Sequence, residues 1–335
     1  MSYNRKRYLQ NRITAGHWTL PVAIFLSAAC WLLTVYLLPE MNVNATSGYS
    51  LWEQYVGQWL PSWGEHTLSL VIIALTGYLL ILLNNVFALI RLCATVQTSL
   101  YLLLASVFPT MHLLQAGNVA SVWLLLSLFL LFRCYQHPNP SGNLFHSFLC
   151  LGVGSLCLPQ LMWLIPILWI GAYRFQALNV RSFFASLLGW GFPYWLLLGY
   201  AYYYNCMELF YLPFQELVTF HPWEFNLQVW EWGLIAYLLL LCTVSASHCL
   251  VAGFEDKLRT RSYLNFLILL TFALFGCMAL QPQFCRQWIP LLLPIASILS
   301  GHLFALTSNR SSNLFFLFML IALFLLFGFS LWTLY

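Results

Sequence analysis

The chain has 335 residues, of which 61% are hydrophobic and 7% are Asp, Glu, Lys or Arg. A soluble domain carries about 25% charged residues because its surface must be solvated, so this composition excludes an ordinary soluble fold. The net charge of +4 does not indicate nucleic acid as a partner, because the positions of the basic residues are better explained as a membrane-topology signal.

Apolar runs of roughly 18 to 25 residues recur along the sequence, the length that a helix needs to cross about 30 Å of hydrocarbon. The runs are unbroken, as in Leu314–Phe329, which excludes the alternating pattern of a membrane barrel. We therefore predict an all-α integral membrane protein, a single polytopic domain over residues 1–335 with about eleven transmembrane helices. In chain order the predicted spans are Trp18–Leu38, Thr67–Ile90, Thr98–Leu114, Asn118–Phe132, Leu144–Leu158, Gln160–Tyr173, Ser182–Tyr204, Leu227–Gly253, Leu264–Leu280, Trp288–Leu306 and Asn313–Tyr335.

Two neighbouring segments within residues 144–174 are unusually short for full spans. Leu144–Leu158 and Gln160–Tyr173 are marginal in length for crossing a bilayer of ordinary thickness. They are either two short helices that cross the membrane or a re-entrant hairpin that returns to the side it left. Both alternatives place the following Arg174 on the same side.

Two connections, residues 39–66 and 205–226, are long and contain several acidic and aromatic residues, and both are predicted to be external. Within the first, Leu51–Leu60 places apolar and aromatic side chains at helical spacing. This pattern predicts an interfacial helix that lies on the membrane surface. The helix either stabilises the protein at the interface or forms a wall of a cavity that faces the lipid.

The Lys and Arg residues determine the predicted orientation, because cytoplasmic loops carry an excess of them. Four basic residues precede the first span, which is expected to act as a signal anchor with the N-terminus in the cytoplasm. With that orientation every Lys and Arg except Arg286 falls on the cytoplasmic side. Arg286 is therefore the basic residue with the most informative position.

Small residues and spaced prolines stand out in two apolar segments. In Phe145–Tyr173, glycines and a serine precede Leu-Pro and a long apolar stretch, and in Phe284–Gly301 an external Arg precedes an aromatic residue and two prolines. The first segment resembles one that recurs in C-class membrane glycosyltransferases, and the second is similar to their RYLLPLLP-type span. Residues Gln97–Tyr204 as a whole also resemble an uncharacterised family of bacterial multi-pass membrane proteins.

The resemblance implies a glycosyltransferase-C-like helical bundle in the bacterial inner membrane that works in envelope glycan assembly. It implies inverting transfer of a sugar from a polyprenyl-phosphate donor, with no cofactor. Arg286, followed by Trp288, would contact the phosphate of the lipid. Glu40 would be the catalytic base, with Glu53 as the other candidate.

The residues themselves leave other functions open. An external Arg286 can equally bind lipid headgroups in general, since a guanidinium offers a fork of donors to any phosphate. A non-catalytic scaffold subunit that holds membrane protein partners in an envelope complex is the main alternative, and small-molecule transport that depends on histidines within the spans is another. His221 with two nearby glutamates does not match the spacing of a metal site, so no metal is predicted.

Overall fold

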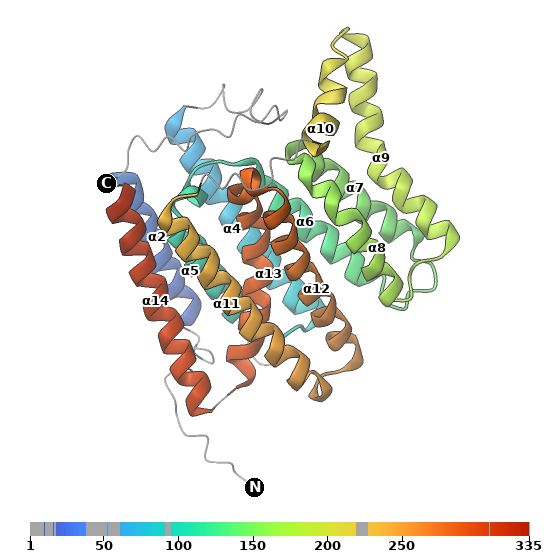
Figure 1. The fold of residues 1–335 in the computed structure, drawn as a ribbon. Helices are drawn as coiled ribbons and strands as arrows, with labels where there is room; N and C mark the ends of the chain where they lie inside the picture. The colour runs from blue at the N-terminus through green and yellow to red at the C-terminus, as the bar shows by residue number, and fades with distance from the viewer. Residues whose placement is uncertain are drawn as a thin grey trace.

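The computed structural model of the chain describes residues 10, 16, 18–37, 52, 61–90, 95–218, 227–307 and 309–334, with all of their side chains except those of Ser62 and Glu255. Within these residues the fold is helical and contains no strand. The elements, shown in Figure 1, are α2 (Thr19–Leu37), α4 (Ser62–Phe87), α5 (Val96–Val107), η1 (Pro109–His112), α6 (Ala116–Arg133), α7 (Ser141–Cys157), η2 (Pro159–Leu164), α8 (Ile165–Arg174), α9 (Val180–Tyr203), α10 (Glu208–Val218), α11 (Val229–Ala252), η3 (Gly253–Glu255), α12 (Leu258–Leu280), η4 (Pro282–Phe284), α13 (Cys285–Leu306) and α14 (Arg310–Leu334).

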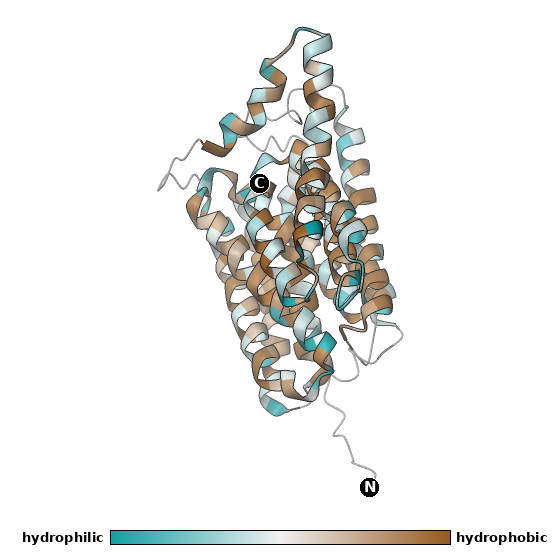
Figure 2. Ribbon diagram, turned by 90° about the vertical axis from the view of Figure 1, so that its right-hand side faces the viewer, coloured by the Kyte–Doolittle hydropathy of each residue, from teal (hydrophilic) through white to brown (hydrophobic). Residues whose placement is uncertain are grey.

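Eight helices in these ranges are long and apolar enough to cross a membrane: α2, α4, α6, α9, α11, α12, α13 together with η4, and α14. Hydrophobic residues run along the helices, whereas hydrophilic ones are concentrated toward the ends of the bundle (Figure 2). The chain is therefore an all-helical, multi-pass membrane protein, as the composition predicts.

The other three predicted spans are short or broken helices. Thr98–Leu114 becomes the twelve-residue α5 followed by η1, Leu144–Leu158 becomes the 17-residue α7, and Gln160–Tyr173 becomes η2 followed by the ten-residue α8. Pro109 and Pro159 begin the two 3-10 turns, because proline has no N–H and disfavours helical backbone in the residue before it. The total of eleven spans is not confirmed and stays a prediction.

The two predicted external connections have different outcomes. The connection 205–226 contains a helix, α10, which the sequence prediction missed. In the connection 39–66 the predicted interfacial helix Leu51–Leu60 lies outside the described residues apart from Trp52, which packs against the core.

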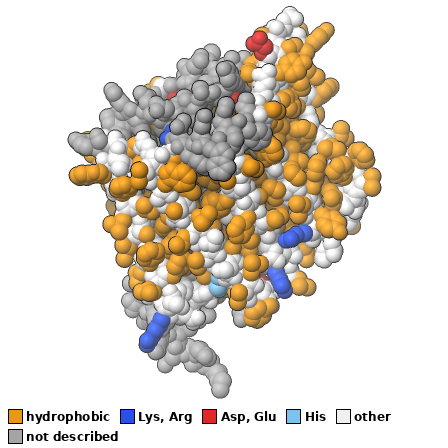
Figure 3. All heavy atoms as spheres, in the orientation of Figure 1, with side chains coloured by type: hydrophobic (Ala, Val, Ile, Leu, Met, Phe, Trp, Pro, Cys, Tyr) orange, Lys and Arg blue, Asp and Glu red, His pale blue; other side chains and the backbone are white. Residues whose placement is uncertain are grey.

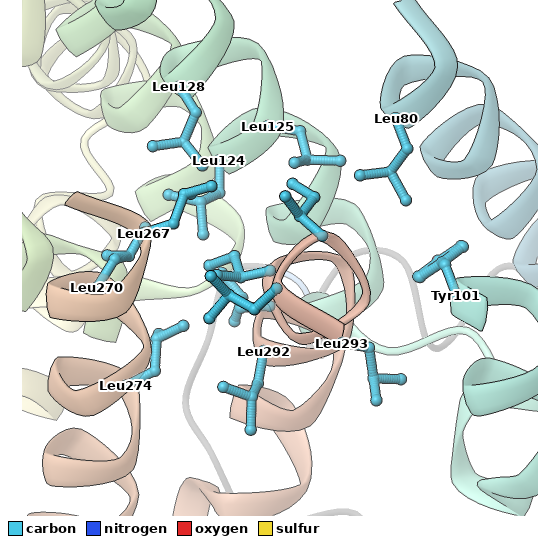
Figure 4. Packing of buried hydrophobic residues seen from close by; sticks show 14 of the residues in the cluster. Leu80, Tyr101, Leu124, Leu125, Leu128, Leu267, Leu270, Leu274, Leu292 and Leu293 are labelled. Carbon is cyan, nitrogen blue, oxygen red and sulfur yellow. The ribbon is translucent and has the colours of Figure 1, made fainter. Parts of the chain in front are cut away.

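Helix α13 is the centre of the bundle, since 89% of the residues in its apolar window are buried. Its neighbours are α5, α6, α11 and α12. Figure 4 shows the leucines of α13 between those of α6 and α12, with residues of α4 and α5 beyond them. The buried side chains labelled there are Leu80, Tyr101, Leu124, Leu125, Leu128, Leu267, Leu270, Leu274, Leu292 and Leu293.

Helices α7, α8 and α9 form a second group that packs on α6 (Figure 1). Helices α7 and α9 approach closely because Gly189 has no side chain: an ideal Cβ there would lie 2.3 Å from the carbonyl oxygen of Phe145. Hydrogen bonds add to this packing, between the hydroxyl groups of Ser127 and Ser147 across α6 and α7 and between those of Ser155 and Tyr194 across α7 and α9.

The two ends of the bundle can be defined by helix direction. We call the end at which α4, α6, α11 and α13 begin the upper end, and the end at which they finish the lower end, as oriented in Figure 1. At the lower end the hydroxyl of Tyr263, near the start of α12, donates to the carbonyl oxygen of Phe132 at the end of α6. This bond and the ring stacking of the same two residues hold the lower ends of α6 and α12 together.

Candidate functional site

Arg286, the basic residue that the sequence places outside, lies in the first turn of α13 at the upper end of the bundle. Its Nε donates to Glu231 Oε1 over 2.6 Å, and its Nη2 donates to Glu231 Oε2 over 3.1 Å. Glu231 lies in the first turn of α11. The pair is therefore a bidentate ion pair that joins the beginnings of two neighbouring helices.

Glu231 is held by its own helix as well as by Arg286. The backbone N–H of Gln228 donates to Glu231 Oε2 over 2.8 Å, which is one half of a capping box at the start of α11. A carboxylate is favourable there because the first turn of a helix carries partial positive charge. The Glu231 side chain is only 3% exposed and that of Arg286 is 19% exposed, so the guanidinium is the more accessible partner.

The positive charge of Arg286 is paired with the carboxylate of Glu231 at the start of a helix. A guanidinium in the first turn of a helix adds its positive charge to the partial positive charge of that helix end. The described carboxylate that faces this combination is Glu231. A phosphate that displaced Glu231 would meet a fork of N–H donors whose geometry matches its oxygens.

Trp288, the second predicted phosphate-contacting residue, lies two positions further along α13 and is fully buried in the hydrophobic core. Its indole Nε1 has no hydrogen-bond partner among the described residues. Arg286 and Trp288 therefore do not lie side by side on the surface. In this conformation Trp288 supports the start of α13 by packing.

The two predicted catalytic bases, Glu40 and Glu53, lie outside the described residues. Glu231, which sequence reasoning did not select, is the carboxylate that the structure places against Arg286. The sequence did contain a signal for this pair, because Glu231 and Arg286 have opposite charges and each lies at the predicted external end of its span.

Further polar groups gather at the upper end beside the start of α13. The start of α6 contacts the start of α13 so closely that a Cβ at Gly117 would lie 2.2 Å from the carbonyl oxygen of Gln287. Asn118 Nδ2 donates to Ser69 Oγ and to the carbonyl oxygens of Met111 and Leu113. These bonds tie α4, η1 and α6 together next to Arg286 and give the upper end a fixed shape.

The histidines that the sequence shows as scattered are partly brought together by the fold. The rings of His248 on α11 and His302 on α13 lie 6.0 Å apart at the lower end. His302 also contacts Asp256 and Cys249. His112 lies in η1 at the upper end and His146 in α7, so neither belongs to this group.

In comparisons with protein-family models, curated proteins and solved structures, no match to this chain was found. The resemblance to C-class glycosyltransferases therefore stays a prediction.

Proposed function

We propose that the chain binds the phosphate of a polyprenyl-linked carrier at the upper end of the bundle, through Arg286. The observation that carries this proposal is the bidentate pair of Arg286 with Glu231 at the start of two apolar helices. A guanidinium at the end of a membrane helix is suited to an anionic lipid headgroup. An isoprenoid tail can lie along the apolar helices while its phosphate meets the guanidinium.

Glu231 has a defined role in this proposal. Without ligand, its carboxylate pairs with the guanidinium and orients it. A lipid phosphate supplies the same kind of charge to the same fork. Glu231 and the phosphate therefore compete for Arg286, and weakening the pair should favour the phosphate.

The finer parts of the proposal concern topology and chemistry. The protein crosses the bacterial inner membrane eleven times with its N-terminus in the cytoplasm, which makes the upper end external. There it transfers a sugar from the carrier lipid with inversion, as the resemblance to C-class glycosyltransferases implies, with Glu40 or Glu53 as the base. The positions of Lys and Arg along the sequence support this orientation.

The test is native mass spectrometry of the purified protein with undecaprenyl phosphate and with the neutral undecaprenol, which differ only in the phosphate. We expect wild type to retain the phosphorylated lipid selectively and Arg286→Ala to lose this selectivity. Glu231→Gln keeps the shape of the side chain but removes its charge, so we expect it to retain at least as much phosphorylated lipid as wild type.

The matched control is Arg310→Ala, which removes an exposed arginine from the first turn of α14 at the lower end. It should bind like wild type. If Arg286 and Glu231 only join two helices, both substitutions should lower thermal stability to a similar degree and neither should change lipid selectivity. That outcome would overturn the proposal and favour the alternative that the protein is a non-catalytic scaffold subunit.

A further inference from the structure

A compact group of four polar side chains lies at the lower end, away from Arg286. His248 and Cys249 are in the last turns of α11, Asp256 follows η3, and His302 is near the end of α13. Cys249, His302 and the Asp256 carboxyl group have at most 2% of their surface exposed, and His248 is half-buried. Burial of so many polar groups in one place calls for a ligand or a dedicated hydrogen-bond network.

The contacts of His302 assign a role to each of its ring nitrogens. Nε2 lies 3.0 Å from Asp256 Oδ2, and Nδ1 lies 3.4 Å from Cys249 Sγ. A carboxylate accepts a hydrogen bond and cannot donate one, so the Nε2 atom carries the proton that points to Asp256. In the neutral ring Nδ1 then carries a lone pair, and this atom is the one that faces Cys249 Sγ.

This arrangement is that of a metal-binding histidine. Histidine ligands usually donate their other ring N–H to a carboxylate, which fixes the tautomer and the orientation of the ring. The candidate ligand atoms of His248, Cys249 and His302 lie within 4.8 Å of one another. We propose that these three residues bind a zinc ion, with Asp256 as the carboxylate that positions His302.

The distances fit zinc after small side-chain rotations. With Zn–N near 2.0 Å and Zn–S near 2.3 Å, two ligands of a tetrahedral site are roughly 3.5 Å apart. The distance from Cys249 Sγ to His302 Nδ1 is already 3.4 Å, so His248 needs the larger adjustment. It is also the half-buried member, which gives the ion a route of entry. Binding converts the Cys249 thiol to a zinc-bound thiolate and releases its proton.

A purely structural ion pair between Asp256 and His302 is the simpler alternative. It accounts for those two residues but not for the position of Cys249 at the other ring nitrogen of His302 or for the closeness of His248 to both. Burial of Cys249 also excludes a thiol that attacks soluble substrates, because the nucleophile would have to be exposed. The chemistry that uses all four side chains in their observed places is metal coordination.

The experiment measures zinc binding by tag-free, chelator-treated full-length protein in detergent. After dialysis against Zn²⁺ and then buffer, metal analysis should find about one zinc ion per chain. Co²⁺ added to the apoprotein should give the visible absorption bands of a tetrahedral site with a thiolate ligand. Cys249→Ser should abolish both signals, whereas Asp256→Asn should weaken zinc affinity by roughly 10–100-fold.

Cys242→Ser is the matched control, because Cys242 is also a buried cysteine of α11 but lies outside the group. It should bind zinc like wild type. If Cys249→Ser does not fold, as judged by size-exclusion chromatography, His248→Asn provides the same test at a half-buried position. Failure of wild type to bind Zn²⁺ or Co²⁺, or unchanged binding by the folded variants, would overturn the proposal. Neither result depends on the lipid-binding function.

Discussion

Single glycines decide where helices of this protein can touch. Between helices in lipid there is little hydrophobic driving force, so association depends on close van der Waals packing and on hydrogen bonds. Gly189 on α9 lies against the backbone of Phe145 on α7, whereas Gly191, two residues further along α9, has no atom within 4 Å of an ideal Cβ. The two positions therefore form a natural pair for comparison.

We predict that Gly189→Ala lowers thermal stability and that Gly191→Ala does not. The methyl group at residue 189 would be 2.3 Å from a carbonyl oxygen, so α7 and α9 must separate, at a cost of about 1–3 kcal/mol. At residue 191 alanine meets nothing and gains helix propensity. Thermal unfolding of the detergent-purified variants checks this, and equal melting temperatures for both would show that α7 and α9 are not packed through Gly189.

For single residues, the sequence identifies a charged residue in an unusual position more readily than it identifies the partner of that residue. Arg286 stands out because it breaks the pattern of Lys and Arg positions. Glu231 is 55 residues away in the chain, and His302 lies 53 residues from Cys249. Such pairs depend on which faces of two helices meet, and a helix that is apolar on all sides gives little signal about its rotation.

The pairing of α7 with α9 also rests on one buried hydrogen bond between elements. Ser155 Oγ lies 2.8 Å from the hydroxyl oxygen of Tyr194 and 2.7 Å from the carbonyl oxygen of Gly152. Since the serine hydroxyl has one proton, which goes to the carbonyl, Tyr194 is the donor to Ser155. Helix α9 continues for about 13 Å beyond Tyr194 at 1.5 Å per residue, so the α7–η2 turn lies well below the top of α9.

We predict a measurable coupling between Ser155 and Tyr194 in a double-mutant cycle of Ser155→Ala and Tyr194→Phe. Side-chain hydrogen bonds between helices in membrane proteins contribute about 0.6 kcal/mol on average. The double variant should therefore be less destabilised than the sum of the single variants by about that amount. Strictly additive changes in unfolding free energy, measured in the same detergent, would contradict the bond.

The elements also show why hydropathy predicted some helices at the wrong length. Apolar composition continues across Phe108–Pro109, so Thr98–Leu114 looks like one run in the sequence, whereas Leu158–Pro159 separates two predicted spans. The backbone nevertheless changes to 3-10 geometry at both prolines. Conversely, α10 was missed because its acidic residues and its internal Pro213 are typical of a loop. The long helices and the break at Pro159 were predictable from the sequence, whereas the change to 3-10 backbone after each proline was not.

The two ends of the molecule differ in the charge of their side chains. Most of the Lys and Arg side chains visible in Figure 3 lie in the lower half, and an acidic side chain is visible at the tip of α9 and α10. Arg133 and Arg174 end helices at the lower end, and Lys257 and Arg310 precede or begin helices there. Arg286, Glu231 and Glu208 begin helices at the upper end. This division follows the positive-inside pattern and predicts a cytoplasmic lower end.

The orientation can be tested with two exposed residues separated by α7, α8 and α9. Cys206 is exposed after α9 at the upper end, and Asn139 is exposed before α7 at the lower end. Whether α7 and α8 cross the membrane or form a re-entrant hairpin, they return to the side they left. Since α9 then crosses, the two residues should lie on opposite sides.

In a chain whose other cysteines are replaced, a membrane-impermeant maleimide should label Cys206 in right-side-out vesicles. With Cys206→Ser, Asn139→Cys should react only after permeabilisation. The reverse pattern would invert the topology and place Arg286 in the cytoplasm, and labelling of both residues from outside would show that α9 does not cross.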